Sequence, residues 1–195
     1  MNSVHLTGVA LAALLSENFI LVNCMGIGTQ IQAFREPRQA LRTGFSVLMS
    51  MVVTVFFTWL ADAFVLRHYN LEYFRLMTFT LLSLGSTALL RLALYTFLPE
   101  LSVRLDQSLA ATSSNCAALG AALLSSMRGY LLDQALTFAF CGGLGVLLVL
   151  VSFAGLRESV GFADCPKAFR GIPIKLITAA LMALALLGFY GLHLE

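Results

Sequence analysis

The sequence predicts an all-α integral membrane protein whose chain crosses the bilayer six times. Of its 195 residues, 59% are hydrophobic and only 11% are charged, whereas soluble domains average roughly 25% charged residues. The mean hydropathy is +0.87, so a 21.1 kDa globule would have too few charges to solvate its surface. The apolar residues also form long runs, and a helix needs about 20 of them to cross roughly 30 Å of hydrocarbon. Strands of a membrane barrel would be shorter, about 10 residues of alternating polarity.

The same composition excludes several classes of function. An ordinary soluble enzyme and a disordered chain are both excluded by the high apolar content. The net charge of +2 is too small for a nucleic-acid binder, which needs a clustered basic face. The loops are too short for a soluble cofactor domain, and no Gly-rich dinucleotide fingerprint is present. We therefore expect a single membrane domain over residues 1–195 that contacts lipid and is not catalytically complete alone.

Six segments satisfy the length requirement for a membrane span. They cover residues 7–33, 44–66, 76–98, 107–127, 135–156 and 172–192. The second, third, fifth and sixth have the composition of ordinary continuous spans. The residues before the first segment, Met1–His5, lack the basic region of a cleavable signal peptide, so we expect that segment to remain as a helix.

The distribution of Lys and Arg predicts the orientation of the spans. The first, third and fifth loops hold most of them, together with Lys175 just inside the sixth span: Arg35, Arg38, Arg42, Arg104, Arg157, Lys167 and Arg170. The second and fourth loops hold only Arg67, Arg75 and Arg128. The positive-inside rule places the odd loops in the cytoplasm. Both termini are then expected outside, in the cytoplasmic (inner) membrane of a bacterium or archaeon.

Three charged residues lie close to the boundaries of these segments. Asp62 and Asp133 fall near span ends, so we expect both at the membrane interface. Arg91 falls inside the third segment, and its long side chain is expected to reach toward the cytoplasmic interface.

The first and fourth segments differ from the others because polar residues interrupt them. Segment one contains Ser16–Asn18 and then Asn23–Cys24, and segment four contains Thr112–Cys116. Such groups are costly at membrane depth unless they face protein or a cavity, and they favour local unwinding where the backbone is buried. We therefore expect helices 1 and 4 to be broken near the midplane. Interruptions at corresponding places in two halves predict inverted three-helix repeats, over about 1–98 and 99–195.

The four cysteines show no CxxC spacing, which argues against a zinc ribbon or a thioredoxin motif. Cys141, in the fifth span, and Cys165, in the fifth loop, are expected to be packing or loop residues. Cys24 and Cys116 each follow an asparagine in an interrupted helix. Two thiolates are half of what an iron–sulfur cluster usually takes. From the residues alone, packing and metal ligation both remain open, and ligation would need a second chain.

Several stretches of the sequence match a known family. They are Glu17–Leu21, Ser114–Gly120, Leu156–Glu158 and Ala163–Gly171, the last running into Ile177–Leu184. On these stretches the chain resembles the A-type subunits of the Rnf complex, the ion-translocating ferredoxin:NAD oxidoreductase. It is also similar to the related E-type subunits of the sodium-pumping NADH:quinone oxidoreductase. The resemblance covers nearly the whole length, and the C-terminal end favours the A type.

The resemblance implies a membrane electron-transfer subunit of a redox-driven ion translocase, moving Na⁺ or H⁺. It implies two inverted three-helix repeats and pairing with a homologous six-helix subunit of opposite topology. An intramembrane [2Fe–2S] cluster would be shared between the two, with two cysteines from each. Further subunits of the complex would carry flavin and iron–sulfur groups. The orientation derived from Lys and Arg agrees with that expected of the A type.

The resemblance implies Cys116 and Cys24 as the cluster ligands of this chain. The polar residues around them would tune the cluster through hydrogen bonds; they are Glu17, Asn18, Asn23 and Asn115.

The family pattern is not met at the first ligand. The expected cysteine falls on Gly28, and the nearest thiol is Cys24, four residues earlier. Four residues are about one helical turn, or roughly 6 Å of rise. Three interpretations remain: Cys24 substitutes after a local shift, the cluster has lost a ligand, or the chain is a divergent relative.

Two other functions compete with electron transfer. A small inverted-repeat transporter would suit the broken helices, although Glu17 is the one acidic residue deep in a span. The second is a scaffold that holds partner subunits without a cluster. The glycine at position 28, where the family has a cysteine, favours this function.

Overall fold

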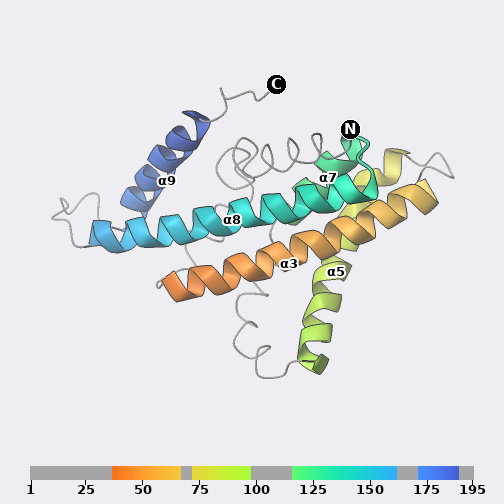
Figure 1. The fold of residues 1–195 in the computed structure, drawn as a ribbon, viewed down its shortest axis with the longest axis horizontal. Coiled ribbons are helices and arrows are strands. Elements are labelled where there is room, and N and C mark those ends of the chain that lie inside the picture. Colours follow the sequence, from red (N-terminus) through yellow and green to blue (C-terminus); the bar gives the residue numbers. More distant parts are fainter. Residues whose placement is uncertain (1–36, 67–71, 98–115, 162–170, 189–195) are drawn as a thin grey trace.

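The computed structural model describes residues 37–66, 72–97, 116–161 and 171–188. Within these ranges the secondary structure is helical, without a strand. Figure 1 shows the elements in order: α3 (Pro37–Ala61), the π-helical turn η2 (Asp62–Leu66), the 3₁₀ turn η3 (Glu72–Phe74), α5 (Arg75–Phe97), α7 (Cys116–Met127), α8 (Leu132–Gly161) and α9 (Ile172–Leu187).

Three of the predicted spans are confirmed as helices long and apolar enough to cross a membrane. They cover Arg38–Leu66, Arg75–Thr96 and Leu132–Leu156, which correspond to the second, third and fifth predicted segments. Pro37 opens α3, where its missing N–H costs nothing because first-turn N–H groups have no helical partner. In the described residues the structure is therefore consistent with the predicted all-helical membrane protein.

The remaining predicted spans are described in part or not at all. Helix α9 begins where the sixth segment was expected and is 16 residues long. Helix α7 covers the C-terminal part of the fourth segment and begins at Cys116. Residues 7–33 and 107–115 lie outside the described residues. The count of six helices, the breaks in helices 1 and 4 and the inverted repeat stay predictions.

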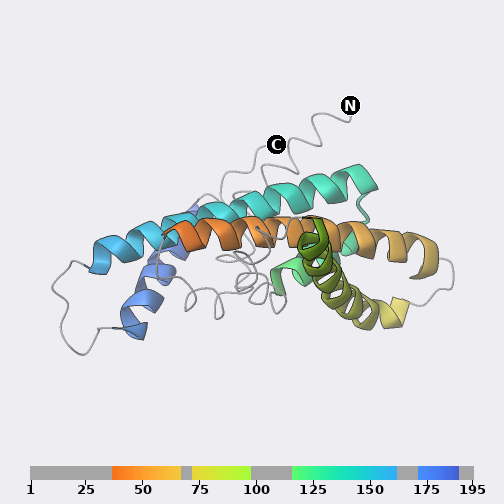
Figure 2. The ribbon, with the colours of Figure 1, turned by 90° about the horizontal axis from the view of Figure 1, so that it is seen from below.

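Helices α3 and α8 run antiparallel, side by side, and form the centre of the molecule (Figures 1 and 2). Two glycines permit their close approach. A Cβ added at Gly44 would lie 3.1 Å from the Leu147 Cα, and one added at Gly143 would lie 3.0 Å from the Leu48 Cα. Small residues allow helix backbones in membranes to come together in this way. Each helix thus places a leucine over the glycine of the other, in a reciprocal contact.

The buried core extends from this pair onto α7 and α5. Met51 and Val55 of α3 and Phe138 of α8 are fully buried, and Phe79 is the fully buried aromatic of α5. Helix α7 buries a face made of alanines: Ala117, Ala118, Ala121 and Ala122. Because alanine side chains are short, α7 can lie close against α3.

Helix α5 leaves most of its surface outside this core. Only 17% of its apolar span is buried, against 50% for the spans of α3 and α8. Large side chains such as Leu81, Leu92 and Tyr95 are exposed along it, and Figure 1 shows it diverging from the α3–α8 pair. An apolar surface of this extent is expected to face lipid or another membrane subunit.

A tight turn joins α7 to α8 and is attached to α3. Gly129 has a φ of +65°, a left-handed conformation that favours glycine at a helix C-terminus. The Tyr130 N–H donates to the Ser125 carbonyl at 3.2 Å. The indole N–H of Trp59 in turn donates to the Tyr130 carbonyl at 3.1 Å, which links α3 to this turn.

Candidate functional site

Cys116 is the one predicted cluster ligand that lies within the described residues. It is the first residue of α7, with a free and exposed thiol, while Ala117 and Ala118 directly after it are buried against the core. Cys116 therefore fits a role as a ligand that a second chain can approach.

The other predicted site residues lie outside the described residues: Glu17, Asn18, Asn23, Cys24 and Asn115. The pairing of Cys24 with Cys116, and the question raised by Gly28, stay predictions. Cys141 lies partly buried against the core of α8, as expected of a packing residue. Within the described ranges no three His, Cys, Asp or Glu side chains gather as a metal site.

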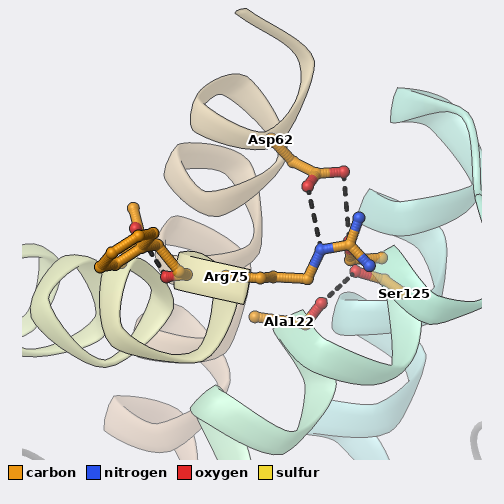
Figure 3. Close-up of polar contacts among 7 residues, drawn as sticks. Asp62, Arg75, Ala122 and Ser125 are labelled. Atoms are coloured by element: carbon orange, nitrogen blue, oxygen red, sulfur yellow. Dashed lines mark hydrogen bonds and ion pairs between the residues drawn. The ribbon is translucent and has the colours of Figure 1, made fainter. Parts of the chain in front are cut away.

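A buried polar junction joins three helices at the other end of α7 (Figure 3). Asp62, the first residue of η2, is 3% exposed. Its Oδ1 lies 3.4 Å from the Nε of Arg75, the first residue of α5. Its Oδ2 accepts a hydrogen bond of 3.1 Å from the Ser126 hydroxyl of α7. The junction therefore ties the end of α3 to the start of α5 and the end of α7.

Asp62 is expected near the membrane interface because it lies close to a span end; the structure adds that its side chain is buried against protein. Packing of α5 and α7 removes its carboxylate from solvent. A buried charge is costly unless an opposite charge and hydrogen bonds compensate it, and Arg75 and Ser126 do so here. Asp133, by contrast, is exposed at the start of α8, which agrees with an interfacial position.

Asp62 ends a row of buried polar side chains on α3, a feature that the sequence interpretation missed. We call this row the α3 column; its members are Ser46, Ser50, Thr54, Thr58 and Asp62. Each is at most 3% exposed. A spacing of four residues places each side chain next to the following one on the helix surface. The spacing is visible in the sequence and was the signal that could have revealed it.

The members of the α3 column differ in their hydrogen-bond partners. The Thr54 and Ser86 hydroxyls are 2.7 Å apart, which joins α3 to α5. Thr58 donates to the Thr54 carbonyl at 2.8 Å, and Ser46 donates to the Arg42 carbonyl at 3.0 Å. Within the part of the chain that the structure describes, the buried Ser50 hydroxyl makes no hydrogen bond.

Comparison with known proteins gives a consistent result over almost the whole chain. A family model described as "Rnf-Nqr subunit, membrane protein" matches residues 6–193. A protein of Syntrophotalea carbinolica, named as the A-type subunit of an ion-translocating oxidoreductase complex, is 39% identical over 184 residues. These residues are 94% of this chain and 95% of that protein.

Two further relatives carry the same name. The protein of Shigella flexneri serotype 5b is 35% identical, over 91% of this chain and 92% of its own length. The protein of Vibrio cholerae serotype O1 is 31% identical, over 93% of this chain and 94% of its own length.

Proposed function

The chain belongs to the Rnf-Nqr family of membrane subunits, and from this we propose that it is the A-type subunit of an ion-translocating oxidoreductase complex. The relatives named above support the A type over the E type of the sodium-pumping enzyme. The three apolar spans support residence in a membrane, and the bacterial relatives favour the cytoplasmic membrane. Since the relatives are named as one subunit of a complex, we propose that flavin- and iron–sulfur-carrying subunits complete it.

The proposed role of the chain is to hold half of a [2Fe–2S] cluster within the membrane, and the position of Cys116 carries this proposal. Its free, exposed thiol begins α7, and the alanine face of that helix packs on α3. This packing holds Cys116 in a fixed position relative to α3, which supports the proposal. The second ligand of this chain is proposed to be Cys24, and a homologous subunit of opposite topology would supply two more. When bound, the cluster would supply a one-electron carrier between cofactors on the two membrane faces.

The contact between α3 and α8 supports the proposed inverted repeat. These helices are the second spans of the two proposed halves, and they run antiparallel. Gly44 is followed four residues later by Leu48, and Gly143 in the same way by Leu147. Each leucine lies over the opposite glycine. A reciprocal contact of this kind is what a two-fold relation between the halves would produce.

A cluster-free transporter or scaffold is the second candidate function. The observation that favours it is Gly28, which stands where the family's first cysteine is expected. On this alternative the complex would contain the chain without iron bound to it.

The deciding experiment is electron paramagnetic resonance of the purified, reduced complex, with iron analysis. We expect Cys116→Ser to abolish a [2Fe–2S] signal, because loss of one thiolate leaves a ligand set short of four. Cys141→Ser is the matched control, since this cysteine of the same chain lies on α8 against the core. A full signal in the Cys116 variant would refute ligation and favour the cluster-free alternative. Cys24→Ala separates the first interpretation of Gly28 from the other two, because only substitution by Cys24 predicts loss of the signal.

A further inference from the structure

The α3 column extends through most of the membrane-spanning length of α3. From Ser46 to Asp62 is sixteen residues, or about 24 Å of helix, close to the roughly 30 Å of a bilayer core. Because four residues slightly exceed one turn of 3.6, the row also winds slowly around the helix. It therefore meets different neighbours along its length: Ser86 of α5 beside Thr54, and Ser126 of α7 beside Asp62.

The chemistry of the α3 column suits a small cation. Hydroxyl groups both donate and accept hydrogen bonds, so a row of them can pass a proton or offer oxygen atoms to Na⁺. The buried Ser50 hydroxyl, which makes no hydrogen bond within the described part of the chain, leaves such an oxygen available in the row. A buried carboxylate stands at the end of the row in Asp62. Ionisable groups within membrane spans mark ion pathways by default.

The Asp62–Arg75 ion pair lies at one end of the α3 column, where it could block the passage of a cation. The Arg75 Nε lies 3.4 Å from the Asp62 Oδ1. The guanidinium therefore occupies the place beside the carboxylate where a bound cation would lie. The Arg75 side chain is 24% exposed while that of Asp62 is 4% exposed. Arg75 is therefore the more exposed member of the pair, and displacement of its side chain would leave the Asp62 carboxylate without this positive charge.

We propose that the α3 column is a route for a small monovalent cation, Na⁺ or H⁺, and that the Asp62–Arg75 pair closes its outer end. This inference rests on the proposed function, because electron transfer would drive the ion. The route itself is argued from the described residues alone. A cation would pass along the hydroxyl oxygens to Asp62, where it competes with the guanidinium of Arg75.

The first test measures passive leakage through the whole complex reconstituted in liposomes, without an electron donor. Arg75→Gln removes the closing charge, so we expect a several-fold faster dissipation of an imposed ion gradient. A pH-sensitive dye and a Na⁺-sensitive dye in parallel samples identify the ion. Arg91→Gln is the matched control, because Arg91 lies exposed on the same helix. If the Arg75 variant leaks ions no faster than the Arg91 variant, the proposal that the Asp62–Arg75 pair closes the route is contradicted.

The second test measures ions transported per electron in the working complex. Thr54→Val keeps nearly the same shape but removes the hydroxyl at the centre of the α3 column, so we expect a clear fall in this ratio with electron transfer retained. Thr80→Val is its control, because Thr80 is exposed on α5 and its hydroxyl binds the Leu76 carbonyl of its own helix. Equal ratios in the two variants would show that the column only joins helices. If Arg75→Gln prevents assembly, this comparison decides the proposal.

These outcomes are separable from those of the proposed function. Ion leakage through Arg75→Gln requires no cluster. The leakage test can therefore support the cation route even if Cys116→Ser leaves the iron signal intact. Equally, loss of the signal in the Cys116 variant leaves the cation route to be judged on its own variants.

Discussion

Trp59 shows how much a single side chain contributes to holding the ends of these helices together. Its indole N–H reaches the Tyr130 carbonyl, which belongs to the turn between α7 and α8. Beside it, the Arg128 guanidinium lies 5.9 Å from the centre of the Tyr130 ring and 5.7 Å from that of Phe138. A cation above aromatic rings at these distances adds a modest attraction. The hydrogen bond and the ring contacts together fix a turn that contains a left-handed glycine.

Replacement of Trp59 by Phe tests the contribution of that hydrogen bond. The change keeps an aromatic ring and leaves the Tyr130 carbonyl without its indole donor, so we expect a loss of about 1 kcal/mol in stability. In a chain of this size that corresponds to a melting temperature lower by about 2–4 °C. Thermal unfolding of the purified complex in detergent measures it, with Phe56→Leu on the exposed side of the same helix as control. An unchanged melting temperature in Trp59→Phe would show that water replaces the indole.

At the candidate site, the sequence could predict single residues better than pairs of them. Cys116 is a candidate because an asparagine and several small polar residues precede it in an otherwise apolar segment, and its role as a ligand stays a prediction. The burial of Asp62 was not identifiable, because its partner Arg75 lies on another helix and only tertiary packing brings the two together. Hydropathy places Asp62 near the end of the second span and Arg75 in the second loop, whereas the structure shows them as an ion pair.

Among the helices, the apolar runs predicted the existence of α3, α5 and α8 and their approximate ends. The boundaries are less well determined by sequence, because hydropathy records apolar content and not hydrogen bonding. Helix α8 continues to Gly161, past the apolar run that ends near Leu156. The π-helical turn η2, which begins at Asp62, has no signal in the hydropathy of the chain. Such π turns are frequent at functional sites.

The crossing of α3 and α8 depends on the absence of a side chain at two positions. Gly44→Ala would place a methyl group 3.0–3.2 Å from Leu147 atoms, including the backbone Cα, so the helices must separate. Overpacking of this kind typically costs about 1–3 kcal/mol. We expect Gly44→Ala and Gly143→Ala each to lower the thermal stability of the complex.

Gly85 provides the control for this prediction. A Cβ added there meets nothing within 4 Å, and alanine is a better helix former than glycine by about 1 kcal/mol. Gly85→Ala should therefore leave stability unchanged or raise it. Equal destabilisation by all three substitutions would show that the loss has another origin than the close approach of α3 and α8.

For the molecule as a whole, the distribution of basic residues predicts which side of the membrane each helix end faces. On this prediction α3 starts at the cytoplasmic face, and the Asp62–Arg75 pair lies toward the outside. The same rule predicts the C-terminus outside, so alkaline phosphatase fused after Glu195 should be active in cells and green fluorescent protein at the same place should be dark. A fluorescent C-terminal fusion would reverse the orientation and with it the outer assignment of the Asp62–Arg75 pair.

The distance along α7 from Cys116 to Ser126 has an electrostatic consequence. Cys116 begins this helix and Ser126, bonded to Asp62, lies ten residues later, which is about 15 Å of helix. At that separation, with an effective dielectric constant near 20, two unit charges interact by about 1 kcal/mol. On the proposed function, an electron held by a cluster at Cys116 would repel a negative charge near Ser126 by about this amount. Such an interaction between the two ends of α7 acts through the electric field and needs no movement of the helix.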